Sequence, residues 1–280
     1  MNCTSVRLSS LNVRGLSNSK EFLHSRCQEN ENLIQCIQEH WLPPPYKKSA
    51  GTNQLRTIHP DFEGFGTSAM KKAVETGVRR GRGFGGTGFI FPKNYSNILK
   101  PLINFNHARV SVMELNCESM EIIIINAYMP FLERSNLLNV ISEYDEVLGF
   151  IEYIISERNN AQFIILGDFN CNIFDSSHPF SASLNDFTKS HNLLCTFSLM
   201  DSFRSDLAFT RHDARSKSLL DYIFISPQLR DKVTNVIIGD YYDNLSDHLS
   251  VEIELSLYLG NVVNGCNSVG KPANVIWSKL

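Results

Sequence analysis

The chain has 280 residues, of which 42% are hydrophobic and 20% charged, and its formal net charge is −3. This composition predicts a globular protein with a sizeable core and excludes a globally basic nucleic-acid binder, although local basic faces could still contact phosphates. Seven scattered cysteines, an N-terminus without a signal-peptide pattern and the lack of an apolar run near ~20 residues together predict an intracellular protein that does not associate with membranes.

Short strand-like runs recur along the chain, each rich in β-branched residues and bounded by Gly, Asn, Asp or Pro. In chain order they are residues 6–13, 33–38, 88–91, 108–115, 122–128, 163–166, 220–225 and 251–257. Helical periodicity predicts a long helix over 136–157 and a shorter one over 183–192. This mixture favours sheets covered by helices in one α/β sandwich over residues 1–258, followed by a tail or linker over 259–280.

Two stretches are expected to contribute little to the core. Residues 43–83 are rich in Gly, Pro, Lys and polar residues, which predicts a long surface excursion. The pattern G-x-G-x-x-G occurs over residues 83–88, but a strand follows it instead of a helix. It is therefore interpreted as a tight turn and not as a dinucleotide-binding loop.

Polar signatures stand at the ends of the predicted strands. Asp168 and Asn170 in GDFN are two residues apart, so on an extended backbone they share a face and could hold a water and a phosphate oxygen together. His248, beside Asp247, could donate to a phosphate oxygen if Asp221 orients the ring. Each of these motifs, taken alone, also fits a local turn or cap.

Three more strand-end residues complete the set. Glu39 supplies the hard oxygen ligand that Mg²⁺ prefers, although it also fits a half-exposed strand end. Asn12 and Tyr128 are weak signals individually, because Asn is common at strand ends and Tyr in cores. Together these groups have the composition needed for metal-assisted attack on a phosphodiester.

The ordered motifs LNVRGL, IQEHW, NAYMP, ILGDFN, LDYIFIS and LSDHLSV resemble those of the endonuclease/exonuclease/phosphatase family, over residues 6–257. Within it, they look most like the apurinic-like endonuclease domain of LINE-type (non-LTR) retrotransposons. The resemblance implies a DNase I-like fold, a four-layer α/β sandwich with two mixed β-sheets. It also implies Mg²⁺ as cofactor, with Mn²⁺ as a substitute.

The resemblance also implies roles for the matching residues. Those implied to be catalytic are Asp168 (which activates the water), Asn170, Tyr128 and the pair Asp221–His248; those assigned to the metal are Glu39, Asn12 and Asp247. Arg14 stands where repair members carry an acid, and Phe131 where an Asn often follows Y-x-P. No counterpart of the abasic-site pocket precedes LDYI, which argues against base-excision repair.

Two basic segments are candidates for the substrate side. Lys71, Lys72, Arg79, Arg80 and Arg82 form the first, and Arg211, His212, Arg215 and Lys217 the second. With Arg14, the arginines and Lys217 are expected to contact DNA phosphates, while solvated loops are the competing interpretation.

The sequence therefore predicts a Mg²⁺-dependent endonuclease that nicks DNA, of the retrotransposon target-site type and located in the nucleus. Two alternatives remain open: a phosphoesterase of the same fold that acts on lipid or inositol phosphates or RNA, and a catalytically decayed DNA-binding remnant.

Overall fold

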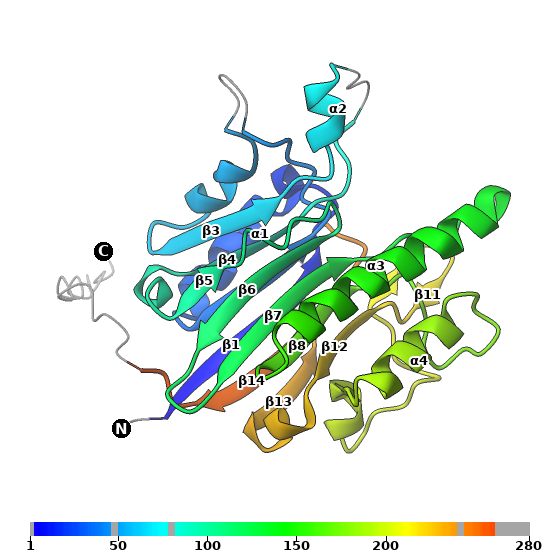
Figure 1. Ribbon diagram of the computed structural model, residues 1–280. Helices are drawn as coiled ribbons and strands as arrows, with labels where there is room; N and C mark the ends of the chain where they lie inside the picture. The colour runs from blue at the N-terminus through cyan, green and yellow to red at the C-terminus, as the bar shows by residue number, and fades with distance from the viewer. Residues whose placement is uncertain (1–2, 46–49, 78–81, 240–243, 261–280) are drawn as a thin grey trace, which may run out of the picture.

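Two six-stranded β-sheets form the centre of the molecule (Figure 1). The computed structural model describes residues 3–45, 50–77, 82–239 and 244–260. The first sheet has the order β13-β14-β1-β2-β4-β3, and the second β5-β6-β7-β8-β12-β9. Each contains one parallel pair, β1 with β2 and β7 with β8, among antiparallel neighbours. Both sheets are therefore mixed, as predicted.

The strands of the first sheet are β1 (Thr4–Asn12), β2 (Leu33–Gln38), β3 (Phe62–Thr67), β4 (Thr87–Pro92), β13 (Val233–Ile238) and β14 (Val251–Leu257). Those of the second are β5 (Leu99–Pro101), β6 (Val110–Asn116), β7 (Glu121–Tyr128), β8 (Gln162–Asp168), β9 (Leu194–Cys195) and β12 (Asp221–Ile225). A separate two-stranded ribbon consists of β10 (Arg211–His212) and β11 (Lys217–Ser218).

Helices cover the outer faces of the sheets. They are α1 (Leu16–Glu29), α2 (Lys71–Glu75), α3 (Leu137–Glu157) and α4 (Ser181–Ser190), with 3-10 helices η1 (Gly51–Thr57), η2 (Lys93–Tyr95), η3 (Arg134–Asn136), η4 (Thr196–Leu199) and η5 (Pro227–Lys232). In Figure 1, α3 and α4 lie against the second sheet, on the side away from α1. With α1 on the first sheet, the order of layers is helix, sheet, sheet, helix, which confirms the predicted sandwich.

Side-chain alternation in β2 explains how the layers hold together. Ile34 and Cys36 point into the core between the sheets, while Leu33 and Ile37 pack in the cluster that α1 shares with the first sheet. Gln35, on the outer face, donates from Nε2 to the carbonyl of Leu23 in α1 at 3.1 Å. Four of the six residues of β2 are apolar and occupy both of its faces, which is why its position could be predicted.

A buried amide pair joins the two sheets near the strand ends. Gln38 Nε2 donates to Asn126 Oδ1 at 2.7 Å, and Asn126 Nδ2 donates to the carbonyls of Ile37 at 3.0 Å and Gly88 at 2.9 Å. Both side chains are fully buried. These bonds fix β7 of the second sheet against β2 and β4 of the first, one or two residues from the predicted site.

The predicted surface excursion over residues 43–83 is wrong for its larger part. This segment contains η1, the edge strand β3 and α2, and it buries Leu55, Ile58, Phe62 and Met70. Strand β3 pairs with β4 from Phe62 to Thr67. Alternating Gly and Phe in FEGFGT concealed the strand, because Gly lowers strand propensity even where the backbone pairs.

Other differences concern the outer layers. The long helix begins at Leu137, as predicted within one residue, but Leu138, expected on its apolar stripe, is 83% exposed. Helix α1 and strand β13 were not predicted. The six cysteines among the described residues form no disulfide. No helix in the described part of the chain is long and apolar enough to cross a membrane.

The connections bring six strand ends to one edge of the sandwich. The C-terminal ends of β1, β2, β7 and β8 meet there, because each pair runs parallel. The first residues of β12 and β14 lie beside them, because these strands run antiparallel to β8 and β1. Side chains that are far apart in sequence therefore come together at this edge, and the space between them is called the hollow below.

Candidate active site

The six strand ends carry the six side chains that the sequence motifs singled out. Asn12 ends β1, Glu39 follows β2, Tyr128 ends β7, Asp168 ends β8, Asp221 begins β12 and His248 precedes β14. All six are connected to one another by hydrogen bonds or close charge contacts, described below. The structure thus brings together the residues that the sequence predicted to be close.

His248 and Asp221 form a buried ion pair. His248 Nδ1 lies 2.9 and 3.2 Å from the two carboxylate oxygens of Asp221, so Nδ1 carries a proton and Nε2 faces the hollow. Thr210 Oγ1 donates to Asp221 Oδ2 at 2.6 Å and fixes that carboxylate. Burial alone would lower the pKa of His248, but the Asp221 and Asp168 carboxylates outweigh it and raise that pKa to about 9. The ring is therefore a cation at neutral pH.

Asp168 is the carboxylate at the centre of the hollow. It is 1% exposed and accepts hydrogen bonds of 2.9 Å from Asn12 Nδ2 and from the backbone N–H of Asn170. Its Oδ2 lies 3.9 Å from His248 Nε2. Burial, followed by the neighbouring Asp221 carboxylate, raises the pKa of Asp168 above its ordinary value. A carboxylate of this kind accepts a proton more readily than an exposed one.

Asn12 connects Asp168 to Glu39. Its Nδ2 donates to Glu39 Oε1 and to Asp168 Oδ2, both at 2.9 Å, while its Oδ1 accepts the backbone N–H of Arg14 at 3.1 Å. That backbone donor sets the amide orientation, so Asn12 presents N–H groups to both carboxylates. Tyr128 completes this group, since burial and then Glu39 and Asp168 raise the pKa of its hydroxyl.

Backbone strain is concentrated around the site. Arg14, Glu39, Trp41 and Asn170 have φ between +44° and +57°, a region that side chains other than Gly rarely adopt. Among the described residues only Asn192, in another part of the fold, shares this feature. Strain persists where surrounding contacts impose it, and its clustering here is typical of functional sites.

The GDFN turn is set by close packing at Gly167 and Asn170. Gly167 has φ +144°, and a Cβ at this position would lie 1.9 Å from the carbonyl oxygen of Ala127 in β7. Asn170 Nδ2 donates to the carbonyl of Met129 at 3.0 Å, which fixes the orientation of the amide. The sequence therefore needs Gly at this point for β8 to approach β7 and deliver Asp168.

Asp247 lies at the rim with two arginines. Its Oδ2 accepts from Arg14 Nη1 at 2.8 Å and from Arg211 Nε at 3.0 Å. Its Oδ1 lies 4.0 Å from His248 Nε2 and has no hydrogen-bond partner among the described residues. The sequence assigned Asp247 to the metal, whereas here one oxygen faces the hollow and the other holds the arginines.

The remaining predicted substrate residues are spread around this edge. Arg82 stacks on Trp41, with Cζ 3.6 Å from the ring centroid, and Lys217 Nζ lies 4.2 Å from the Phe209 ring centroid. Arg215 is exposed in the ribbon loop. Arg79 and Arg80 lie outside the described residues. Those that the structure places are thus at or near the rim and not in the core.

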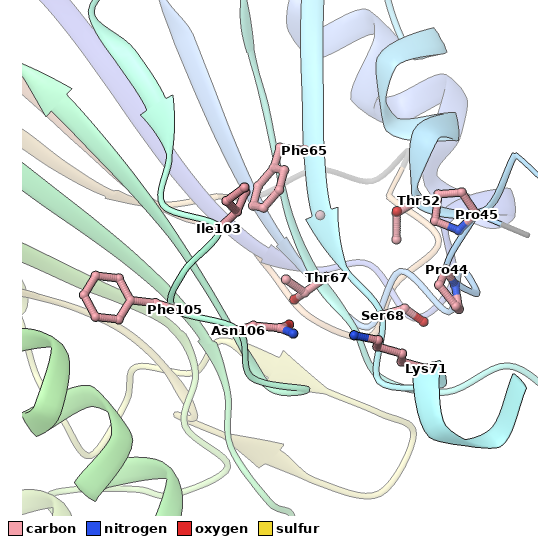
Figure 2. Close-up of a pocket in the computed structure, with 11 residues that line it drawn as sticks. Pro44, Pro45, Thr52, Phe65, Thr67, Ser68, Lys71, Ile103, Phe105 and Asn106 are labelled. Atoms are coloured by element: carbon pink, nitrogen blue, oxygen red, sulfur yellow. The ribbon is translucent and has the colours of Figure 1, made fainter. Parts of the chain in front are cut away.

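A separate pocket of about 260 Å³ lies beside the edge strand β3 (Figure 2). Phe65, Pro44, Pro45 and Ile103 give it apolar walls. Lys71, from the first basic segment, and Asn106 point toward each other across its opening in Figure 2. Lys71 therefore belongs to this hollow and not to the Asp168–His248 site.

The acidic groups fit a divalent cation. Glu39 and Asp168 are two carboxylates that Asn12 holds side by side. Asp168, Asp221 and His248 also cluster within 4.8 Å, but the protonated His248 ring has no free lone pair for a metal and is paired with Asp221. Burial and the nearby Asp221 carboxylate raise the pKa of Asp168, so a bound cation would stabilise its ionised form. Oxygen ligands with uncompensated negative charge are what hard cations prefer.

Some residues of the site had no recognised sequence signal. Trp41 Nε1 donates to Glu39 Oε2 at 3.0 Å, Thr210 holds Asp221, and the Arg109 guanidinium lies 5.4 Å from the Tyr128 ring centroid. Trp41 could have been found, because it stands two residues after Glu39 in a predicted loop. Thr210 and Arg109 act through contacts that only the fold creates.

The comparisons with known proteins agree with this geometry. Residues 122–252 match the endonuclease-reverse transcriptase family. No curated protein matches the chain. Among solved structures, the AP endonuclease LMAP from Leishmania major has a TM-score of 0.71 at 16% identity, with 90% of this chain and 88% of that chain covered.

Two further structures share the fold at similar identity. The 3′ phosphatase NExo from Neisseria, bound to a product DNA hairpin, has a TM-score of 0.66 at 14% identity and covers 90% of this chain and 99% of its own. The endonuclease domain of TRAS1, a telomere-specific non-LTR retrotransposon, has a TM-score of 0.62 at 14% identity, with coverages of 91% and 100%. The family match therefore covers the part of the chain from β7 to β14, and the structural matches show that the whole described chain has the fold of these nucleases.

Proposed function

We propose that this protein is a Mg²⁺-dependent endonuclease that nicks DNA. The observation that carries the proposal is the pairing of a buried, proton-accepting Asp168 with a buried imidazolium at His248, whose Nε2 is 3.9 Å away. A base for the attacking water and a cation for the phosphate thus lie within one hollow. Phosphodiester hydrolysis needs both.

Each side chain has a distinct task in this proposal. Asp168 takes a proton from water as the water oxygen bonds to phosphorus and the bond to the leaving oxygen breaks. His248 donates from Nε2 to a phosphate oxygen and offsets the charge that accumulates there, while Asp221 holds the ring. Asn170 supplies an N–H donor beside the same phosphate, and the leaving oxygen gains a proton from solvent.

A divalent cation would be held by Glu39 together with the neighbouring carboxylates. When bound, it would supply positive charge to the phosphate and the leaving oxygen. Asn12 keeps Glu39 and Asp168 at a fixed separation through its two hydrogen bonds. Magnesium is proposed because two carboxylates plus substrate oxygens suit its coordination, with Mn²⁺ as a substitute.

DNA is the proposed substrate because cations line the rim. Arg14 and Arg211 lie at one side of the hollow, held by Asp247, and Arg82 lies over Trp41. One similar structure is bound to a DNA hairpin, and another comes from a retrotransposon endonuclease. A target-site nicking role and a nuclear location would follow from that likeness.

Conversion of supercoiled plasmid to open circles, with Mg²⁺ and with EDTA, tests the proposal. Asp168→Asn and His248→Gln should each lower the rate by about 10²–10³-fold. Asp186→Asn, which removes an exposed charge on α4, should leave it unchanged. Intact plasmid with ample Mg²⁺ would refute the nicking activity, and turnover of RNA or inositol phosphates instead would transfer the chemistry to another substrate.

A further inference from the structure

Trp41 is joined to the carboxylate that the proposed function assigns to the metal. Its indole Nε1 donates to Glu39 Oε2 at 3.0 Å, while Asn12 Nδ2 holds the other oxygen, Oε1, at 2.9 Å. Each oxygen of Glu39 therefore has one N–H donor, and the Tyr128 hydroxyl also bonds this carboxylate. Two donors at fixed positions leave the carboxylate little freedom to rotate.

The indole ring itself is held in place by close backbone contacts. A Cβ on Gly15 would lie 2.4 Å from Trp41 Cε3, and a Cβ on Gly83 would lie 2.5 Å from the carbonyl oxygen of Trp41. The backbone N–H of Trp41 donates to the carbonyl of Gly85 at 3.0 Å. Gly15 thus leaves room for the indole ring beside the β1–α1 turn, and Gly83 leaves room for the Trp41 backbone beside the loop before β4.

The face of the same ring holds a substrate-side cation. The guanidinium of Arg82 lies 3.6 Å from the ring centroid, within the range of a cation–π contact. Arg82 is exposed, so this contact leaves its outer N–H groups available. One side chain therefore contacts a proposed metal ligand with its edge and a proposed phosphate contact with its face.

The backbone at this turn supports a functional reading. Glu39 has φ +54° and Trp41 has φ +57°, two strained residues within three positions. Strain of this kind costs of order 1–3 kcal/mol per residue and is retained where the surroundings impose it. The contacts of the indole ring are among those that impose it.

We propose that Trp41 is a positioning residue that sets the orientation of Glu39 for the cation and, with its other surface, the position of Arg82 for the nucleic acid strand. This inference rests on the proposed function, because it assumes that Glu39 holds the cation. Groups that orient a metal ligand commonly change metal affinity by 10–100-fold when removed. Loss of the indole N–H should therefore weaken cation binding, whereas loss of Arg82 should weaken only DNA binding.

Replacement of the N–H alone is the sharpest test. The chain contains two tryptophans, Trp41 and Trp277. In a Trp277→Phe background, bound Mn²⁺ should quench the emission of Trp41, and Glu39→Gln should abolish this quenching. Trp41→Phe, and a benzothienylalanine at position 41 that keeps the ring shape but lacks the N–H, are then compared for Mn²⁺ affinity by electron paramagnetic resonance.

Both replacements should weaken Mn²⁺ binding by about 10-fold or more. Arg82→Met should leave Mn²⁺ affinity unchanged and weaken binding of a DNA duplex several-fold. Phe84→Leu, which removes an exposed aromatic ring from the same loop, is the control and should leave Mn²⁺ affinity unchanged. Thermal melting checks that each variant is folded.

The outcomes separate the inference from the proposed function. If the parent protein binds no Mn²⁺ near Trp41, the metal part of the proposed function fails and the inference fails with it. If the parent binds Mn²⁺ and the benzothienylalanine protein binds it equally well, the inference is overturned while the proposed function stands. An equal loss of Mn²⁺ affinity in Arg82→Met would also overturn the inference. The contact of Arg82 with the ring face would then affect the cation as much as the bond from the ring edge to Glu39 does.

Discussion

The positive charge on His248 should make the free energy of unfolding depend on pH, and this can be measured without a substrate. The pKa of the buried ring is about 9 in the folded protein, against 6.5 for an ordinary imidazole. A raised folded-state pKa gives stability that is fully present below the unfolded value and is lost as the pH rises through the folded value. At about 1.4 kcal/mol per pH unit, the ring contributes about 3 kcal/mol that disappears between pH 6.5 and pH 9.

Asp168 also lowers the free energy of unfolding as the pH rises, but over a lower pH range than His248. Burial and Asp221 raise its folded-state pKa, so its ionisation opposes folding once the pH exceeds the ordinary carboxyl range. Without a divalent cation, the free energy of unfolding should therefore fall steadily as the pH rises toward 9. A bound cation would compensate the carboxylates and reduce this fall.

Urea unfolding in EDTA at pH 6, 7.5 and 9, followed by fluorescence, measures this dependence. Other groups titrate in the same range, so the informative quantity is the difference between the parent protein and His248→Gln. That difference should shrink by about 3 kcal/mol from pH 6 to pH 9. A difference that stays constant across this range would refute the ion pair as the origin of the charge.

Three further changes have expected outcomes. Thr210→Val removes the 2.6 Å hydrogen bond to Asp221 Oδ2 and should lower the nicking rate about 10-fold while the fold persists by circular dichroism; an unchanged rate would show that Asp221 needs no such support. Gly167→Ala puts a Cβ 1.9 Å from the carbonyl oxygen of Ala127 and should lower the free energy of unfolding by more than about 3 kcal/mol, measured by urea titration; a stable variant would mean that β8 can move away from β7. Arg211→Ala should reduce the slope of log Kd for DNA against log salt by about 1 in fluorescence anisotropy, and a slope equal to that of the parent would exclude a phosphate contact there.

The sequence indicated the residues of the site more completely than it indicated the elements of the outer layers. Asp168 follows a run of four apolar residues in β8, and His248 precedes β14, in which apolar and polar residues alternate. Both patterns indicate a strand in the sequence. Strand β3 lies at the edge of the first sheet and α1 lies on its outer face, so a few apolar residues suffice in each and their periodicity is weak. Leu138 had the right spacing but faces solvent, because spacing fixes the side of a helix and not how far the neighbouring layer extends.

Contacts between segments that only the fold brings together could not be predicted from the sequence, for a different reason. Thr210 meets Asp221 because the segment before the ribbon folds back over β12, and no local pattern encodes that return. The resemblance assigned Asp247 to the metal, and no spacing in the sequence indicated its pairing with Arg14, 233 positions away. Sequence spacing indicates which groups share an edge and says little about which of them pair.

The amide bridge between Gln38 and Asn126 has a wider consequence. Glu39 belongs to one sheet and Tyr128 and Asp168 to the other, so a lateral slip of the layers would pull the catalytic groups apart. Because these hydrogen bonds join the two sheets next to the site, changes at the periphery of the fold should not alter the relative positions of its side chains. Loops on the rim can then change in length or charge while Glu39, Tyr128 and Asp168 keep their relative positions.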